Sequence, residues 1–307
     1  MRILVTGGAG FIGSNLAIRL QRDGHEVVVA DDFSSSRWSN LCSFGGDVLT
    51  VDVAGDLGAL NSLDRFEVIF HQASITDTTV LDQRKMMHNN VEGFRQILGV
   101  AQRCRSRLIW ASSASVYGRG RAPMSEAQAP EPLNVYAYSK LVMERLAERW
   151  KPRLAEPIIG LRYFNVYGPG EDHKGKFASM VHQLAAQMRS GKRPRIFAAG
   201  QQRRDFVHVD DVVQANINAM TAGESGVFNA GSGNGDSFNQ VVAELNRVLG
   251  ADLPAEYFEN PYSFTQDWTQ ADLTRSRQVL GYKPRYGLAE GIAAYHASGK
   301  LGVRNGG

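Results

Sequence analysis

Thr6-Gly7-Gly8-Ala9-Gly10-Phe11-Ile12-Gly13 is the stretch of sequence that decides the fold. It follows a short apolar run, Ile3-Leu4-Val5, and it opens a segment in which Ile12, Leu16 and Leu20 recur every four residues. A buried strand, a glycine-rich turn and an amphipathic helix in this order predict the first unit of a dinucleotide-binding fold. The glycines allow a tight turn, close approach of the backbone to a pyrophosphate, and close packing of the helix on the strand.

The same unit predicts where a dinucleotide binds, because the first helix turn offers free N–H groups and a positive dipole end to phosphates. Asp31 ends the next apolar run, Val27-Val28-Val29, 18 residues after Gly13 and close to the spacing of a ribose-binding acid. Asp31 and Asp32 repel a 2′-phosphate and favour NAD, whereas Arg37 in the following loop can pair with one and favours NADP. The sequence leaves NAD or NADP open and favours NAD.

Further apolar runs repeat the pattern of the first unit at Val48–Val51, Val68–Phe70 and Leu108–Trp110, with helix-length stretches between them. Strands that alternate with helices predict an α/β fold with a doubly wound parallel sheet. Beyond residue 165, helical patterns at 177–189, 211–220, 238–249 and 288–296 alternate with short strands and glycine-rich turns. We therefore expect a Rossmann domain over residues 1–165 and a smaller α/β substrate lobe over 166–307, with some elements returning to the sheet.

The composition, 43% hydrophobic and 21% charged over 307 residues, is that of a globular protein and excludes disorder. A net charge of 34 − 31 = +3 does not argue for nucleic acid. No apolar run reaches the roughly 18 residues of a membrane span, and the N-terminus lacks the apolar core of a signal peptide. Cys42 and Cys104 are too few for a disulfide framework or a zinc site. We expect a cytoplasmic protein without a metal, nucleic acid or membrane partner.

A second motif carries candidate acid–base chemistry. Tyr136 and Lys140 are four residues apart in an expected helix, so both side chains can point at one ligand. A neighbouring ammonium is expected to lower the pKa of Tyr136 toward working pH. Upstream, the expected strand from Leu108 ends in Ser112 and Ser113, where doubly wound sheets place ligands. Taken singly, these residues also fit a surface tyrosine and ordinary turn serines.

With these features the chain resembles the extended short-chain dehydrogenase/reductase family, the nucleotide-sugar epimerases and dehydratases. The resemblance covers nearly the whole chain and implies that Ser113, Tyr136 and Lys140 are the catalytic trio. It runs through the motifs TGGAGFIG (6–13), FHQAS (70–74), NNVEG (89–93), SSASVYG (112–118), YAYSK (136–140), RYFNVYGP (162–169) and RRDFVHVDD (203–211).

The resemblance also implies a nucleotide-sugar substrate, a homo-oligomer and a tightly bound NAD or NADP. The cofactor contacts that it implies are Gly7, Gly10, Phe11, Ile12, Gly13, Asp31, Asp32, Arg37, Asp52, Val53, Gln72, Ala73, Ser74, Asn90, Tyr136, Lys140 and Tyr163. The substrate contacts that it implies are Ser113, Asn165, Lys174, Phe197, Arg204 and Trp268, with Arg204 on a phosphate.

Two stretches bear on the reaction. Dehydratases of the family carry an Asp-Glu pair where this chain has Ala114 and Ser115, which disfavours dehydration. The loop Gly168–Gly175 and the later TQADL stretch (269–273) are similar to ADP-glycero-manno-heptose 6-epimerases, which invert the carbinol at C6 of a heptose. That similarity implies that Lys174 is a second acid/base, on the other side of the substrate from Tyr136. The alternative is a solvated loop lysine beside Lys176.

One departure weakens the heptose interpretation, because residues Tyr262 to Trp268 lack the basic residue that those enzymes carry there. Trp268 either stacks on a base or belongs to the core. A UDP-hexose 4-epimerase that uses Tyr136 alone and a nucleotide-sugar keto reductase remain as alternatives. A non-catalytic NAD(P)-sensing protein is disfavoured, since Tyr136 and Lys140 are intact beside Ser113.

Overall fold

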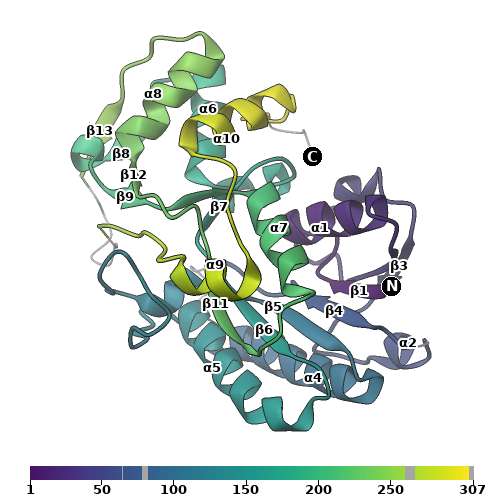
Figure 1. The fold of residues 1–307 in the computed structure, drawn as a ribbon. Helices are drawn as coiled ribbons and strands as arrows, with labels where there is room; N and C mark the ends of the chain where they lie inside the picture. Colours follow the sequence, from purple (N-terminus) through teal and green to yellow (C-terminus); the bar gives the residue numbers. More distant parts are fainter. Residues whose placement is uncertain (64, 78–81, 260–266, 304–307) are drawn as a thin grey trace.

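A seven-stranded parallel sheet forms the centre of the molecule in this computed structural model, which describes residues 1–307 except 64, 78–81, 260–266 and 304–307 (Figure 1). The strand order is β11-β6-β5-β4-β1-β2-β3, which reverses beside β1 as in doubly wound folds. The prediction of an α/β, doubly wound sheet is confirmed. The strands are β1 (Arg2–Thr6), β2 (Glu26–Asp31), β3 (Asp47–Thr50), β4 (Val68–His71), β5 (Arg107–Ser113), β6 (Ile158–Tyr163) and β11 (Gly226–Ala230).

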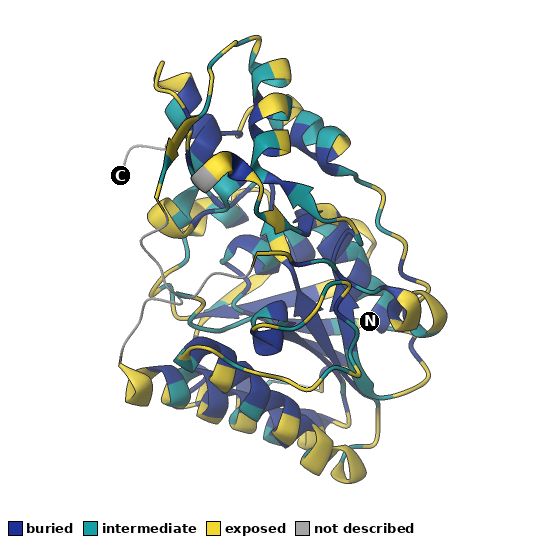
Figure 2. Ribbon diagram, turned by 90° about the vertical axis from the view of Figure 1, so that its left-hand side faces the viewer, coloured by how far each residue is buried: buried dark blue, intermediate teal, exposed yellow. Residues whose placement is uncertain are grey.

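Helices cover both faces of the sheet (Figure 1). On one face, α1 (Phe11–Arg22) and α7 (Val209–Ala219) pack against the strands through an apolar cluster that contains Leu16 and Val212. On the other face, α4 (Gly93–Cys104) and α5 (Val135–Trp150) form a second cluster with Ile97 and Met143. The short helices α2 (Gly58–Asn61) and α3 (Gln83–Met87) and a π-helical turn (His88–Glu92) precede α4. Because both faces are covered, the central strands are almost entirely buried (Figure 2) and mostly apolar.

A smaller lobe lies beyond the carboxyl edge of the sheet, where α6 (Met180–Arg189), α8 (Phe238–Leu249) and α10 (Leu288–Ala297) enclose a third apolar cluster (Figure 1). α6 begins later than the helical pattern from residue 177 predicts, because the Ser179 hydroxyl accepts from His182 N (3.2 Å) and caps it. The remaining elements are β7 (Asn165–Tyr167) with β10 (Phe206–His208), β8 (Arg195–Phe197) with β13 (Glu256–Phe258), β9 (Arg203–Arg204) with β12 (Asp236–Ser237), and α9 (Thr274–Leu280).

Two elements from the second half of the chain pack with the strands and helices of the first half. α7 packs on α1, and β11 adds the edge strand beside β6. Both follow residue 165, so the elements of the central sheet are not contiguous in sequence; the domain boundary at that residue stays a prediction. Among the described residues, no helix is long and apolar enough to span a membrane.

A buried ion pair fastens α5 to the sheet. Arg162 on β6 donates from Nε and Nη2 to the two carboxylate oxygens of Glu144 on α5, at 2.8 and 2.7 Å. Ser112 on β5 donates its hydroxyl to the same carboxylate at 2.6 Å. The Arg162 guanidinium also lies over the ring of Tyr117, 4.6 Å from its centroid. The buried charge pair therefore connects α5 to the two strands β5 and β6.

We predict that Glu144→Gln lowers the free energy of unfolding by about 3–5 kcal/mol, because Arg162 is left buried without its counter-ion. The matched control is Glu92→Gln, which breaks an exposed pair with Arg95 (2.9 Å) and should change stability by less than about 1 kcal/mol. Urea denaturation of both variants is the measurement. Equal losses in the two variants would contradict a special role for the buried pair.

Candidate active site

The turn between β1 and α1 is a cradle that side chains would fill. Gly7 has a positive φ of 66°, and a Cβ on it would lie 2.5 Å from the backbone nitrogen of Ala73. A Cβ on Gly13 would collide with the Gly7 carbonyl oxygen. Gly10 begins α1 without a side-chain cap, and the first helix turn holds no acidic residue. Backbone N–H groups there are free for an anion, so the cradle fits the pyrophosphate of a dinucleotide.

Hydrogen bonds hold the carboxylate of Asp31, the last residue of β2, in place. Asp31 is 6% exposed and accepts from Ala9 N (2.9 Å), Phe33 N (2.9 Å) and Ser36 Oγ (2.7 Å). A carboxylate has about four acceptor positions, so one remains for a ligand hydroxyl. Asp32 is exposed. Asp31 thus joins the end of β2 directly to the glycine-rich turn.

Two expected cofactor residues, Gln72 and Tyr163, share a partner that the sequence did not indicate. Tyr163 donates to Gln72 Oε1 (3.0 Å), and Asn216 on α7 donates to the Tyr163 hydroxyl (2.9 Å) and accepts from Gln72 Nε2 (3.2 Å). Burial raises the pKa of Tyr163, so its hydroxyl stays protonated. Asn216 lies 53 residues from Tyr163 in sequence, in no motif, and only the fold reveals it.

Asn90, in the π-helical turn, is fully buried. Its amide oxygen accepts from Ile75 N (2.8 Å), and its nitrogen donates to Ile75 O (3.1 Å) and Ser139 Oγ (2.9 Å). These bonds join the exit of β4 to α5 beside Lys140, so Asn90 supports the helix that carries Tyr136 and Lys140. Of the other expected cofactor residues near this exit, Ala73 and Ser74 are half-buried, Val53 is buried and Asp52 is exposed. Their contacts with a cofactor stay predictions.

Ser113, Tyr136 and Lys140 come together at the carboxyl end of β5. Asn134 caps α5 by accepting from Ala137 N (2.8 Å), which places Tyr136 in the first helix turn. Tyr136 is hydrogen-bonded to Ser113. Lys140 Nζ donates to Ala111 O (2.8 Å) and lies 5.8 Å from the centroid of the Tyr136 ring. The structure therefore brings the three predicted catalytic side chains together.

The pKa of Tyr136 differs from the expectation. Burial raises the pKa of Tyr136, partly offset by its hydrogen bond with Ser113, and burial lowers the pKa of Lys140 to about 7. The expected lowering of the Tyr136 pKa by Lys140 is wrong for this structure, because the cost of burying a phenolate dominates. A lysine with a pKa near 7 can exchange protons at neutral pH.

Lys174 lies in a loop of residues 168–178, here called the Lys174 loop. Its Nζ is 5.8 Å from the centroid of the Phe11 ring, in the first turn of α1. Burial lowers the pKa of Lys174, and the nearby Glu171 carboxylate opposes that shift. Lys176, two residues further on, is exposed. The position of Lys174 beside the dinucleotide turn favours a chemical role over a solvated loop lysine.

The expected substrate contacts of the second lobe lie apart from the trio in sequence. The Arg204 guanidinium is 6.0 Å from the centroid of the Phe238 ring, and burial lowers its pKa. Trp268 is 49% exposed, so the alternative of a plain core residue is wrong. The Phe197 ring packs on Phe258 with their centroids 4.9 Å apart. Asn165 is exposed, and the stretch 262–266, where the expected basic residue is missing, lies outside the described residues.

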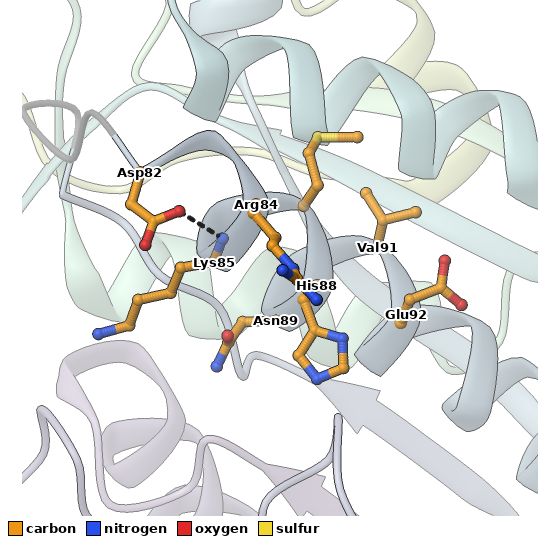
Figure 3. A pocket seen from close by; sticks show the side chains of 8 residues that line it. Asp82, Arg84, Lys85, His88, Asn89, Val91 and Glu92 are labelled. Carbon is orange, nitrogen blue, oxygen red and sulfur yellow. Dashed lines mark hydrogen bonds between the residues drawn. The ribbon is translucent and has the colours of Figure 1, made fainter.

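A cavity of about 480 Å³ on α3 and the π-helical turn contains none of the predicted site residues (Figure 3). Its polar lining includes Arg84, Lys85, His88 and Asn89, and Asp82 accepts from Lys85 N (2.9 Å) at the start of α3. This cavity is separate from the catalytic trio, and we assign it no part in the reaction.

The fold and the site define an enzyme of the nucleotide-sugar epimerase class. The chain belongs to the NAD-dependent epimerase/dehydratase family, whose model matches residues 3–231. It is similar to an ADP-L-glycero-D-manno-heptose-6-epimerase from Helicobacter pylori, with 40% identity, a TM-score of 0.91, and coverage of 97% of this chain and 95% of that one.

Two other solved structures are also similar to the chain. A UDP-glucose 4-epimerase from Thermotoga maritima shares 31% identity (TM-score 0.90, 96% of this chain and 97% of that one). A UDP-glucuronic acid 4-epimerase from Bacillus cereus, solved with UDP-glucuronic acid and NAD, shares 27% (TM-score 0.85, 97% and 98%). The predictions of the family, of an NAD(P)-dependent nucleotide-sugar epimerase and of a Rossmann-type fold are confirmed. The particular sugar is not decided by these relatives.

We predict that Gly10→Val weakens dinucleotide binding by more than about tenfold, equivalent to about 1.4 kcal/mol. A Cβ on Gly10 would lie 3.2 Å from Gly7 O. The valine methyl groups would occupy the space through which the pyrophosphate approaches the N-terminus of α1. The control is Gly99→Val on α4, where an added Cβ meets nothing within 4 Å. Titration calorimetry with NAD is the measurement, and unchanged affinity in Gly10→Val would contradict the assignment of the turn.

Proposed function

We propose that this chain is an ADP-glycero-manno-heptose 6-epimerase. The observation that carries the proposal is the half-buried amine of Lys174 beside Phe11, at the start of the dinucleotide-binding helix. The site thereby offers a second proton-carrying group besides Tyr136. The similarity to the Helicobacter pylori heptose epimerase, at 40% identity over nearly the whole chain, supports the same substrate.

Inversion of a carbinol removes its hydroxyl proton and its carbon-bound hydrogen, and returns both so that the centre is inverted. When bound, the nicotinamide cofactor supplies the reversible hydride transfer. The hydroxyl of Tyr136 exchanges the proton in one orientation of the substrate, and the Lys174 amine exchanges it in the other. Ser113 holds the oxygen beside Tyr136. Two groups are needed because a single fixed base does not reach the oxygen equally in both orientations.

Lys140 contributes by position and by its protonation state. Its amine is anchored on Ala111 O and is buried beside Tyr136, with a pKa near 7. It can therefore donate to a ribose hydroxyl and exchange protons with the site at neutral pH. Arg204, and Trp268 with its exposed face, are the groups that we assign to the phosphates and the base of the nucleotide.

A UDP-hexose 4-epimerase is the second candidate, since the Thermotoga maritima enzyme, solved with UDP-glucose, has a TM-score of 0.90. In that case Tyr136 alone serves both faces of the sugar, and Lys174 has no part in proton transfer. The two candidates therefore differ in what happens when Lys174 is removed.

We predict that Lys174→Met and Tyr136→Phe each lower turnover of ADP-heptose about 10²- to 10⁴-fold, or about 3–5 kcal/mol of barrier. Each variant should still carry out a half-reaction on the epimer whose oxygen faces the remaining base. Steady-state and single-turnover assays on both epimers are the measurements.

Lys176→Met is the matched control for Lys174→Met, because it removes an exposed lysine from the same loop. Its turnover should equal that of the unmodified enzyme. If Lys174→Met also inverts its substrate at the full rate, Lys174 is not a base. A 4-epimerase that uses Tyr136 alone, tested with UDP-glucose, then becomes the better assignment.

We also predict that the enzyme binds NAD more tightly than NADP, by about tenfold or more. A 2′-phosphate would approach the Asp31 and Asp32 carboxylates, and like charges at short range repel. The dissociation constants of the two cofactors are the measurement, with Arg37→Ala as the companion variant. Tighter binding of NADP, lost in Arg37→Ala, would show that Arg37 outweighs the acidic pair.

A further inference from the structure

The Lys174 loop follows β7, yet it lies against the dinucleotide turn at the start of the chain. Asn15 on α1 donates from Nδ2 to Pro169 O (2.9 Å), a contact across 154 residues of sequence. Asn40 Nδ2 donates to Ala9 O (2.9 Å) in the glycine-rich turn and lies 3.2 Å from Nδ1 of His173 in the loop. Two asparagines therefore connect the loop that carries Lys174 to the segment that binds the cofactor.

Both N–H groups of the Asn15 side chain are already hydrogen-bonded. Its amide group has two N–H donors, and the second one is held by Phe11 O at 2.8 Å. The amide is thus fixed between the first turn of α1 and the loop. Gly170, at a φ of 97°, lets the loop lie close, because a Cβ there would be 3.2 Å from Asn15 Nδ2.

The far end of the loop is anchored independently. Glu171 is fully buried and accepts from Gly168 N (3.0 Å), from Ser179 N (2.5 Å) and from Ser179 Oγ (2.9 Å). Lys174 N in turn donates to Glu171 O (2.9 Å), which closes the turn that carries the lysine. Glu171 sets the shape of the loop relative to α6, whereas the hydrogen bonds of the two asparagines join the loop to α1 and to the glycine-rich turn.

We propose that Asn15 and Asn40 are positioning residues that hold the Lys174 loop on the dinucleotide turn and thereby place the Lys174 amine. The role of Lys174 as a base in this statement rests on the proposed function. The tether itself does not, because it is a set of contacts between chain segments. Asn15 is the sharper target, since both of its bonds are to backbone carbonyls.

Asn15→Asp tests the tether with almost no change of shape, because it removes both donors and keeps the size of the side chain. We expect kcat at saturating NAD to fall about 10²-fold through misplacement of Lys174. Combined with Lys174→Met, it should cause no further loss, because both changes remove the same base. Asn40→Ala should act in the same direction.

Asn246→Ala is the matched control. Asn246 on α8 also joins a helix to a loop, donating to Leu253 O (3.1 Å) and accepting from Leu253 N (2.9 Å). Asn246 lies in the smaller lobe, on α8, which packs against α10. A loss of stability without a loss of kcat is the expected result, which separates general destabilisation from misplacement of Lys174.

Limited trypsin digestion supplies a readout that does not depend on activity. Lys174 and Lys176 both lie in the loop, and because a protease cleaves a segment faster when it opens from the folded structure, release of the loop from α1 should speed cleavage there. We expect Asn15→Asp to speed cleavage at these two lysines about tenfold or more, as identified by mass spectrometry of the fragments. Asn246→Ala should leave the rate at these sites unchanged.

The two readouts separate the two proposals. Faster cleavage at Lys174 and Lys176 together with a non-additive loss of kcat supports the positioning role. Unchanged cleavage and unchanged kcat in Asn15→Asp, with Lys174→Met still impaired, would overturn it and leave the proposed function standing. If Lys174→Met retains full turnover, the proposed function and the positioning role fail together, while faster cleavage would still establish the tether.

Discussion

The buried pair of Glu144 and Arg162 is the interaction on which the position of α5 against the sheet depends. Burying two charges costs free energy, and this cost is offset only where the charges pair with each other and further hydrogen bonds occupy their remaining donors and acceptors. Here the two side chains meet in a bidentate contact, and Ser112 supplies a third bond. Since Glu144 is one helical turn beyond Lys140, this requirement fixes the height of α5 against the sheet. Tyr136 and Lys140, the predicted catalytic residues on this helix, take their positions from it.

The second constraint acts from the other side of the site. The glycine turn leaves space beside α1, and the Lys174 loop is fastened to the same helix through Asn15. The chain thus places one proton-carrying group on a helix of the sheet and another on a loop docked at the dinucleotide turn. In the proposed reaction this separation is what allows the substrate oxygen to be served in two orientations. Burial lowers the pKa of Lys174 and of Lys140, whereas it raises the pKa of Tyr136.

Much of this was predictable from local patterns. The turn at residues 6–13 and the apolar runs that follow it predict the doubly wound sheet, because each strand–turn–helix unit is encoded within about thirty residues. The spacing of Tyr136 and Lys140 placed both on one helix face, and the strand that ends in Ser113 placed the serine at the sheet edge. Glu144 was within reach of the same reasoning, since it is four residues beyond Lys140 on the catalytic helix.

What the sequence by itself determined is therefore the class of fold and the dinucleotide turn, which arise from short-range periodicity and turn chemistry. The trio of Ser113, Tyr136 and Lys140 was predicted through the resemblance to the family. Only the tertiary structure decided which distant residues complete them. Asn216 reaches Tyr163, Asn15 reaches Pro169, and Arg162 finds Glu144. The pKa directions also required the fold, since the raised pKa of Tyr136 reflects its burial and not its neighbour four residues away. Hydrogen-bond partners and desolvation depend on contacts between segments far apart in the chain, and no local pattern specifies those contacts.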